Sequence, residues 1–461
     1  MQCHNTNAHI IDSEVFGSGF ALDEFKILFS DKAKLQRWMD VEVALAKSQA
    51  DLNIIPKIAA EYIGKHSELR KLDFDYIKEE IKLTGHSLVP LLKAWQRVLP
   101  KEYAHYLHYG ATTQDIQDTA QSLEIKICCQ ILLKLINETL KKLLYFTKIY
   151  KNEAIIGRTH GQQALLTTLG LKFSVWLDEL LRHAKRLKLF METNLVTQLF
   201  GGVGTMSALG SNAIELQNQF ATYLGLSAPL CAWHVSRDRF AEFSGILALL
   251  TGTYGKIANE ILQLSKNEIG EFREGFSKED IGSSTMPHKH NPEKCERVVL
   301  LSKLVKCSAF ISLDGLINEH ERDYRSMRAE WVVLSESTNY TGCAIKMMNE
   351  ILSNIEICSE NISRNIKNSI YSLSSEKILF FLSKYTNKSN AYKIVYDIFK
   401  DYKHYVDNSD IFNTIKEHPL VDFDINRKDF DLIFEYEQHI GSSDIIIDNV
   451  ISEVNNFLSK T

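Results

Sequence analysis

One stretch of the sequence limits the fold more than any other, because from Ala111 to Ile156 it contains no glycine and no proline. Apolar residues recur in it at steps of three to five, close to the period of an α-helix. These residues are Ile116, Ala120, Leu123, Ile127, Ile131, Ile136, Leu140 and Leu144. Further leucines widen the apolar stripe beyond one face. A helix this long and apolar needs partners on several sides, which predicts a large helix bundle.

Four later segments repeat this pattern and predict four more long helices, at 171–198, 238–271, 293–318 and 328–359. Short alternating runs, which are typical of strands, are largely absent, so the predicted fold class is all-α. The part before the bundle has shorter helical segments, and the composition shifts to Ser, Asn, Lys, Tyr and Ile after it. We therefore expect three domains, at 1–110, 111–360 and 361–461.

The composition excludes several classes of function. A net charge of −5 provides no basic surface for nucleic acid and no polybasic anchor for a membrane. The sequence has no run of about eighteen apolar residues, and its start lacks the pattern of a signal peptide. The eight cysteines form no CxxC pair. We expect a reduced, cytoplasmic protein that does not act at a membrane.

The first polar segment with possible chemistry is "HYGATTQDIQDTA", residues 108–120. Thr112 or Thr113 can cap the long helix, with Asp115 in its first turn. Such a cap has no function beyond stability in many proteins. The alternative is that the hydroxyls and the free N–H groups of the helix end bind a carboxylate or a phosphate.

The second segment is "GRTHGQQA", residues 157–164, which we expect to form a loop between two long helices. Its His160 is flanked by Gly, Thr and Gln and is not on an apolar face. It is either a solvated turn residue or a functional one.

The third segment, "GSSTMPHKHNPEKCE" at 282–296, reads as an exposed loop that closes over something. Backbone amides around Ser283 can hold its hydroxyl as an alkoxide, and Lys289 supplies a positive charge. Glu296 begins the next helix. Two alternating histidines without a Cys or carboxylate partner are weak support for a metal site. A glycine-rich stretch, "FGGVGTMSALG", follows a helix rather than a strand, so it fails the test for dinucleotide binding.

Together these segments resemble the aspartase/fumarase superfamily. The residues that match its signature loop are Gly282, Ser283, Ser284, Met286, Pro287, Lys289, Asn291, Pro292 and Glu296. The first two segments, "SRDRFAEF" and the tail "SLSSEKILFFLSKYTNKSNAYKIV" resemble the branch of adenylosuccinate lyase and 3-carboxy-cis,cis-muconate cycloisomerase. The resemblance implies three helical domains and a homotetramer whose core is the pooled central helices. Three subunits would build each active site, with no metal or organic cofactor.

The resemblance also implies a reaction, the anti elimination across a succinyl unit that usually releases fumarate. Ser283 would be the base, and Lys289 with Asn291 would stabilise the aci-carboxylate dianion. His160 would protonate the leaving nitrogen, oriented and kept cationic by Glu296. The substrate would be a small molecule with two carboxylates.

Further residues match positions that contact substrate in the family. They are His86, His108, Thr112, Thr113, Gln263 and Arg322. In "ERDYRSMRAEW", Arg325 and Arg328 depart from the adenylosuccinate lyase pattern, and they bind a carboxylate or phosphate or are solvated helix charges. The ending of this segment and "HIGSSDIIIDNV" look more like the cycloisomerases, although bacterial cycloisomerases commonly lack the histidine at position 160.

Three hypotheses follow for the function. The first is a carbon–nitrogen lyase of adenylosuccinate lyase type, acting on adenylosuccinate or a non-nucleotide N-succinyl amine. The second is a lactone-forming cycloisomerase. The third is a catalytically silent scaffold, against which the intact Ser283, His160, Lys289 and Glu296 argue.

Overall fold

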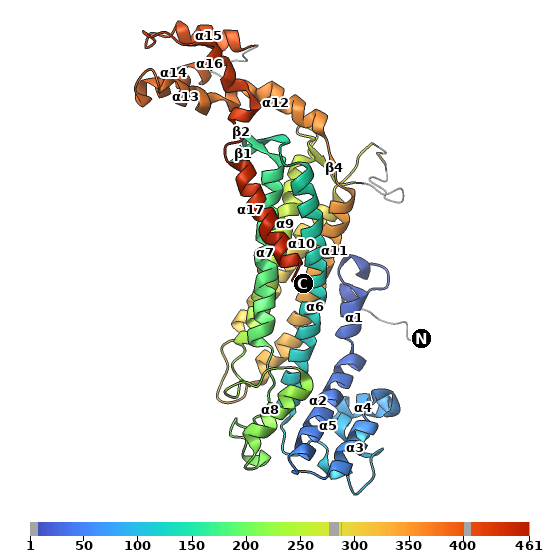
Figure 1. Ribbon diagram of the computed structural model, residues 1–461. Coiled ribbons are helices and arrows are strands. Elements are labelled where there is room, and N and C mark those ends of the chain that lie inside the picture. Colours follow the sequence, from blue (N-terminus) through green and yellow to red (C-terminus); the bar gives the residue numbers. More distant parts are fainter. Residues whose placement is uncertain (1–7, 276–284, 287, 401–406, 461) are drawn as a thin grey trace. The chain divides into compact units, whose positions relative to one another are not determined.

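A computed structural model of the chain describes residues 8–275, 285–286, 288–400 and 407–460. Within these residues the fold is helical, with two small two-stranded sheets, which confirms the predicted all-α class (Figure 1). The N-terminal part holds five helices, α1 (Asp23–Leu28), α2 (Asp31–Asp51), α3 (Lys57–Lys65), α4 (Phe74–Thr84) and α5 (Val89–Gln96). Short 3-10 turns connect some of them.

The five long helices predicted from the sequence are present. They are α6 (Thr113–Ile149), α7 (Leu169–Asn194), α9 (Asp238–Leu264), α10 (Glu293–Asp314) and α11 (Tyr324–Asn354). Their ends differ from the prediction by up to seven residues. The largest difference is at α9, where Gly270 has a φ of 62° and the chain then enters a short strand. A shorter helix, α8 (Ala213–Leu224), precedes α9.

The C-terminal part holds α12 (Ser359–Leu373), α13 (Ser375–Leu382), α14 (Lys388–Phe399), α15 (Asn408–Lys416), α16 (Arg427–Asp431) and α17 (Ser443–Leu458). Caps start several of these helices. In α14, for example, the Asn387 side chain accepts a hydrogen bond from the N–H of Asn390.

The segment around His160, which we expected to be a loop, is a β-hairpin. Strand β1 (Ala154–Thr159) pairs antiparallel with β2 (Gln162–Thr168). The turn consists of His160 and Gly161, with φ values of 53° and 77°. Two positive φ values suit the right-handed twist of the flanking strands, so a two-residue turn closes the hairpin. A second small sheet pairs β3 (Phe272–Arg273) with β4 (Glu356–Ile357).

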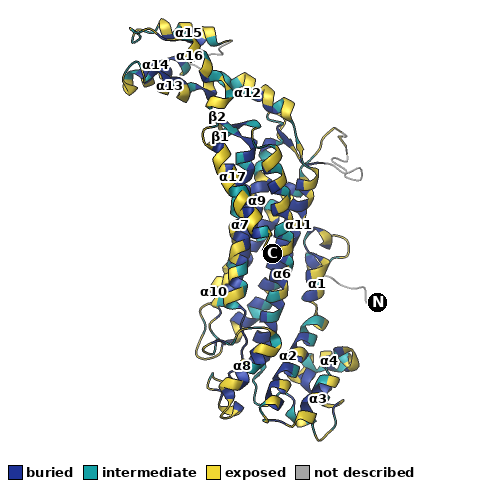
Figure 2. Ribbon diagram, viewed as in Figure 1, coloured by how far each residue is buried: buried dark blue, intermediate teal, exposed yellow. Residues whose placement is uncertain are grey.

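The chain forms two compact units, and the long helices contribute to both. The first comprises residues 1–137, 182–256 and 297–348, and the second comprises 138–181, 257–296 and 349–461. Buried residues follow the inner faces of the helices (Figure 2). The three-domain division stays a prediction. Among the described residues, no helix is long and apolar enough to cross a membrane.

In the first unit, α6 contacts α11 where Gln121 donates a hydrogen bond of 2.8 Å to Glu330. In the second unit, the same two helices are joined by a 2.8 Å hydrogen bond from Thr139 to Asn349. All four side chains belong to the bundle interior. Within each unit, therefore, α6 packs against α11, as the apolar stripe on α6 requires.

Candidate active site

The start of α6 is held by one buried carboxylate. Asp115 is fully buried and accepts hydrogen bonds from the backbone N–H groups of Thr112, Phe200 and Gly201, at 3.1, 3.0 and 2.9 Å. The ring of His234 lies 3.0 Å from its other side. Asp115 thus ties the first turn of α6 to the glycine-rich turn at 200–204. From sequence we identified it only as a first-turn residue.

Arg322 joins the same two segments. Its Nη1 donates to the Thr112 hydroxyl at 2.9 Å, and its Nη2 donates to the Gly202 carbonyl at 2.8 Å. The structure therefore brings together Thr112 and Arg322, which the sequence analysis named separately. The guanidinium has further N–H groups, and this position beside the α6 N-terminus suits an anion.

A cavity of about 270 Å³ lies beside this cluster in the first unit. Four residues predicted to bind substrate line it, namely His86, Thr113, Arg322 and Arg328. The other lining residues are Gly85, Ser87, Gln114, Gln117, Tyr324 and Met327. The lining is mostly polar and carries two arginines but no carboxylate, so it suits a small acidic ligand.

His86 has a defined tautomer in this cavity. Its Nδ1 accepts hydrogen bonds from the backbone N–H groups of Leu88 and Val89, at 3.3 and 3.1 Å. A neutral ring with Nδ1 as an acceptor carries its proton on Nε2. His86 can therefore donate from Nε2 while its ring is held by the start of α5.

Gln117 extends the polar wall. The amide of this buried side chain donates a 2.7 Å hydrogen bond to the Ser87 hydroxyl. Its Oε1 has no hydrogen-bond partner among the residues that the structure describes. The sequence analysis missed Gln117 because a glutamine one turn into a helix usually faces solvent.

His108 lies outside the described lining of this cavity and forms an ion pair instead. Its backbone has a φ of 62°, and its Nδ1 lies 2.6 Å from the buried carboxylate of Glu42. Burial alone would lower the pKa of the imidazole, but the charge of Glu42 and the hydrogen bond to it outweigh burial. The pKa of His108 is therefore raised above its usual value.

Arg325 is occupied by carboxylates. It hydrogen-bonds Asp323 at 2.6 Å and pairs with Glu319 at 3.0 Å, and two-thirds of its side chain is exposed. The hydrogen bonds from Arg325 hold the pKa of Asp323 well below its usual range. A role of Arg325 in substrate binding stays a prediction.

The first unit also contains a buried ion cluster that the sequence analysis did not identify. Arg237, in the segment "SRDRF", donates to Asp118 at 2.8 and 3.0 Å and to Glu330 at 2.7 Å. All three side chains are buried. Burial raises the pKa of Glu330 and the arginine opposes that effect, with a net shift upward. One guanidinium bonded to both carboxylates joins α6 and α11 to the residue that precedes α9.

In the second unit, the hairpin that carries His160 is anchored close to its turn. Arg158 makes a bidentate pair with Glu271, with distances of 2.8 and 2.7 Å. Glu271 is fully buried and also accepts a 2.9 Å hydrogen bond from Asn365. His160 itself lies exposed at the tip, in the left-handed turn conformation. The anchor therefore positions the hairpin while the imidazole stays accessible.

The signature loop at 282–296 lies partly outside the described residues. Ser283, the predicted base, is among those that are not described. Lys289 is exposed and Asn291 is half-buried, ahead of α10. Glu296 is exposed in the first turn of α10. Gln263, near the end of α9, is half-buried.

The residues directly before the segment 276–284 make specific contacts. Before it, Glu274 is buried and accepts hydrogen bonds from the N–H groups of Lys294 and Cys295, at 3.1 and 2.8 Å. A Cβ atom at Gly275 would clash with the carbonyl of Asn354, so this position requires glycine. Burial raises the pKa of the Cys295 thiol, which keeps it protonated.

No group of three or more His, Cys, Asp or Glu side chains in the described part of the chain is placed to hold a metal ion. What the described residues offer is a set of hydrogen-bond donors and positive charges. Such a set binds carboxylates and stabilises anionic intermediates.

Comparisons with known proteins identify the family of this chain. A family model described as lyase matches residues 19–306. N-acetyl-S-(2-succino)cysteine lyase of Dickeya dadantii is 34% identical over 96% of this chain and 97% of its own. Adenylosuccinate lyase of Methanocaldococcus jannaschii is 32% identical over 95% of each chain. The crystal structure of beta-carboxy-cis,cis-muconate cycloisomerase from Acinetobacter calcoaceticus superposes with a TM-score of 0.85 at 28% identity, covering 95% of this chain and all of the other.

The matches to the named relatives and to the solved structure extend over nearly the whole chain. The matched proteins are, by their names, two lyases and a cycloisomerase. Of the residues around the cavity, His86 and Thr113 lie within the region that the family model matches, and Arg322 lies beyond its end. The chain therefore belongs to the aspartase/fumarase superfamily of lyases, in the branch of the adenylosuccinate lyases and carboxymuconate cycloisomerases.

Proposed function

We propose that this lyase releases fumarate from a succinate that carries a thioether or amine substituent on carbon 2. The observation that carries the proposal is the 270 Å³ cavity, in which Arg322 shares a polar lining with His86 and Thr113. Two relatives support the substrate class, because one is named for an S-(2-succino) thioether and the other for adenylosuccinate. The succinyl unit is the part that these substrates share.

In this proposal the succinyl carboxylates bind in the cavity. Arg322 presents a planar guanidinium that is already held by Thr112 and Gly202, so little side-chain entropy is lost on binding. Thr113 adds a hydroxyl at the N-terminus of α6, where free N–H groups favour negative charge. His86 can donate from Nε2 to a carboxylate oxygen.

The chemistry is a balanced elimination. Ser283 takes a proton from the methylene carbon beside one carboxylate, and the electron pair moves into that carboxylate as an aci-dianion. Lys289 and Asn291 stabilise this charge. The pair then returns to form the carbon–carbon double bond, and the bond to sulfur or nitrogen breaks with its electrons on the leaving atom. His160 supplies a proton to a leaving amine, and Glu296 orients the imidazole.

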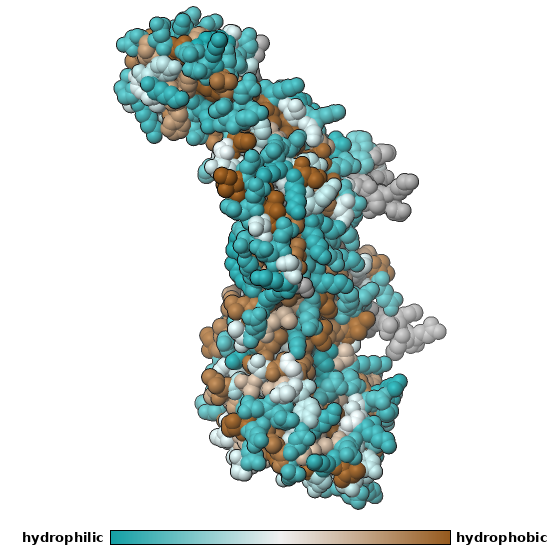
Figure 3. Space-filling view, viewed as in Figure 1, coloured by the Kyte–Doolittle hydropathy of each residue, from teal (hydrophilic) through white to brown (hydrophobic). Residues whose placement is uncertain are grey.

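Assembly into a homotetramer, with three subunits around each site, is part of the proposal. Large apolar side chains are exposed on the long helices of the single chain, as Figure 3 shows between polar neighbours. In the first unit they include Leu189 on α7, Leu249 on α9, Phe310 on α10 and Val332 on α11. Exposed apolar residues on several bundle helices support burial against other copies.

A subunit-mixing experiment tests the shared site. Ser283→Ala and His160→Gln variants, each expected to have little activity toward an amine substrate as a homotetramer, are mixed after mild dissociation and assayed with that amine substrate. Mixed tetramers regain part of the activity if the two residues reach one site from different subunits. No regain, with mixed tetramers present by mass spectrometry, contradicts the shared site.

A substrate panel tests the reaction. We expect fumarate, followed by its ultraviolet absorbance, from N-acetyl-S-(2-succino)cysteine, adenylosuccinate or simpler 2-succinyl thioethers and amines. Absence of fumarate from all of them contradicts the proposal.

One specific observation keeps the cycloisomerase as a second candidate, namely the TM-score of 0.85 to a cycloisomerase structure. Lactone formation from 3-carboxy-cis,cis-muconate, abolished by Ser283→Ala and unaffected by His160→Gln, would favour it. The same panel therefore separates the two candidates.

A further inference from the structure

A second and larger cavity adjoins the first in the same unit. Its volume is about 750 Å³, and Gly85, Ser87, Tyr324 and Arg328 line both cavities. It extends from this shared edge between α2, α4 and the start of α11. The two cavities are therefore neighbours that share these four residues.

The body of the larger cavity is apolar and largely aromatic. Trp38 of α2 and Trp331 of α11 form one side, with ring centroids 5.9 Å apart. The remaining apolar residues of the lining are Phe29, Leu35, Phe74, Ile77, Ile81 and Tyr324. Flat rings on several sides favour a flat or extended apolar group. A volume of this size, within the range of about 300–1,000 Å³ for ligand pockets, holds more than a short aliphatic chain.

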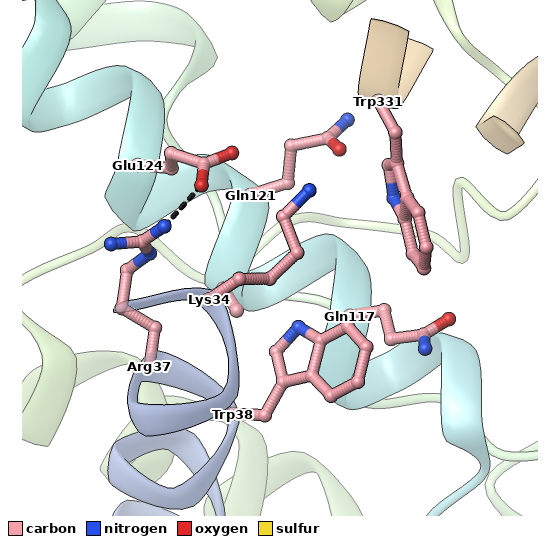
Figure 4. Close-up of a pocket in the computed structure, with 8 residues that line it drawn as sticks. Lys34, Arg37, Trp38, Gln117, Gln121, Glu124 and Trp331 are labelled. Carbon is pink, nitrogen blue, oxygen red and sulfur yellow. Dashed lines mark hydrogen bonds and ion pairs between the residues drawn. The ribbon is translucent and has the colours of Figure 1, made fainter. Parts of the chain in front are cut away.

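Two cations in this wall form no ion pair in the described part of the chain. Lys34 Nζ lies 4.5 Å from the centroid of the Trp331 ring, and the Arg328 guanidinium lies 3.9 Å from the same ring. Within the described residues, neither forms an ion pair or donates a hydrogen bond, and the Nε of Arg328 is buried without a partner. Figure 4 shows Lys34 extending toward Trp331 and Gln121, while the nearby Arg37 is neutralised by Glu124.

Burial is the main cause that lowers the pKa of Lys34, and it outweighs the charges of Glu124 and Asp31, which act in the opposite direction. A half-buried cation without a partner costs free energy, which an anionic ligand group would recover. Two further lysines line the cavity at exposed positions, and Lys82 of these is paired with Glu79 at 2.9 Å. Asp31 is the acidic residue of the lining.

We infer that this second cavity binds the leaving group, and that the leaving group combines a flat apolar body with an anionic group. The inference rests on the proposed function, because the succinyl end must occupy the first cavity. The anionic group, a carboxylate or a phosphate, would lie between Lys34 and Arg328. An aromatic thiol or amine with a carboxylate and a purine nucleotide both have this chemistry, and the experiment distinguishes them.

The experiment compares substrates that share the succinyl unit. The thioethers of thiophenol and of 4-mercaptobenzoate differ by one carboxylate, and adenylosuccinate carries the phosphate. If a carboxylate is the anion, we expect the wild-type kcat/KM to be at least about tenfold higher for the mercaptobenzoate thioether than for the thiophenol thioether. If phosphate is the anion, we expect a similar advantage over the thiophenol thioether for adenylosuccinate alone. A wild-type ratio near one, with no advantage for adenylosuccinate, overturns the inference.

Lys34→Met tests the cation that belongs to the large cavity and not to the small one. We expect this variant to reduce the ratio of kcat/KM between anionic and neutral substrates about tenfold, while Lys65→Met, at an exposed position at the end of α3, leaves it unchanged. Because the ratio is independent of the fraction of folded enzyme, a loss of stability does not imitate the effect. An unchanged ratio in Lys34→Met overturns the inference.

A binding measurement separates this inference from the proposed function. Free 4-mercaptobenzoate, or AMP, should quench tryptophan fluorescence, and Trp331→Leu should remove most of the change. If no substrate releases fumarate, the proposed function fails. If fumarate is released but neither compound binds at Trp331, only the inference about the leaving group fails.

Discussion

Glu274 caps helix α10 from the far side of the signature loop, with its Oε2 accepting a 2.8 Å hydrogen bond from the N–H of Cys295. The second oxygen accepts from the N–H of Lys294 at 3.1 Å. A carboxylate at a helix N-terminus satisfies free N–H groups and interacts favourably with the helix dipole. This contact joins the chain on the two sides of the segment 276–284, which contains the predicted base Ser283 and lies outside the described residues.

Replacing Glu274 by glutamine should weaken its hydrogen bonds to the N-terminus of α10. The amide keeps the size of the side chain but loses the charge and one acceptor, so we expect unfolding to become easier by about 1 kcal/mol. Because this contact joins the two sides of the segment that contains the predicted base, kcat should fall more than KM rises. Glu293→Gln, an exposed change in the first turn of the same helix, is the matched control. Equal effects of the two variants on kcat would contradict the positioning role of Glu274.

Asp115 should be among the residues most sensitive to substitution. Asp115→Asn removes a buried charge that serves the N–H groups of Thr112, Phe200 and Gly201. We expect a loss of about 3 kcal/mol in the free energy of unfolding, measured with urea. Asp75→Asn, at the exposed start of α4, should change it by less than about 0.5 kcal/mol.

Asp115 and Glu274 show what the sequence could and could not predict. The long helices follow from local apolar periodicity, and the first turn of α6 was assigned to the right residues. Three of the four partners of Asp115, namely Phe200, Gly201 and His234, lie 85 to 119 positions away, and those of Glu274 lie 20 and 21 positions away. No local pattern encodes such contacts. The hairpin at His160 was missed because its strands are short and its turn is only two residues long.

Candidate site residues divide in the same way. Motif resemblance selected His86, Thr113 and Arg322 one at a time, and the structure places them around one cavity. Arg328 was left open between a substrate contact and a solvated charge, and it lies half-buried against Trp331. Lys34 and Gln117 were missed because a lysine or glutamine on a helix carries no signal of its own. Their significance depends on which other helix faces them.

The His108–Glu42 pair should make stability depend on pH in a defined direction. The pKa of His108 is raised in the folded chain, so folding takes up a proton at pH values between the unfolded and the folded pKa. The stabilisation is fully present below the unfolded pKa of about 6.5 and is lost as pH rises through the folded pKa. His108→Gln should remove this component. Urea titrations of both proteins at about pH 6 and about pH 9 should therefore differ more at the lower pH.

A larger difference at the higher pH would have the opposite sign and would contradict an ion pair. His105→Gln is a suitable control, because this exposed neighbour lies in the same 3-10 turn region. Its substitution should shift both titrations equally.

His160→Gln should distinguish cleavage of a carbon–nitrogen bond from cleavage of a carbon–sulfur bond. A thiolate leaves without prior protonation, since the thiol pKa is about 8.5, whereas an amine nitrogen must gain a proton. We expect kcat for amine substrates to fall about 100-fold or more and kcat for thioethers to fall far less. Parallel losses on both substrates would show that His160 acts in binding or in shaping the site. Arg158→Lys, which weakens the bidentate anchor to Glu271 but keeps the imidazole, tests that alternative.

Arg322→Lys should show whether substrate binding depends on Arg322, which is held by Thr112 and Gly202, rather than on Arg325. A lysine can reach either the Thr112 hydroxyl or the Gly202 carbonyl, but its single ammonium cannot span both and still bind a carboxylate in the planar, two-pronged manner of a guanidinium. We therefore expect kcat/KM to fall about 100-fold, with most of the loss in KM, because the lost contact binds ground state and transition state alike. Arg325→Lys is the matched control, since this side chain is paired with Asp323 and Glu319 at the surface. If Arg325→Lys caused the same loss, the ion pairs would have to open for substrate, and Arg325 would belong to the binding site.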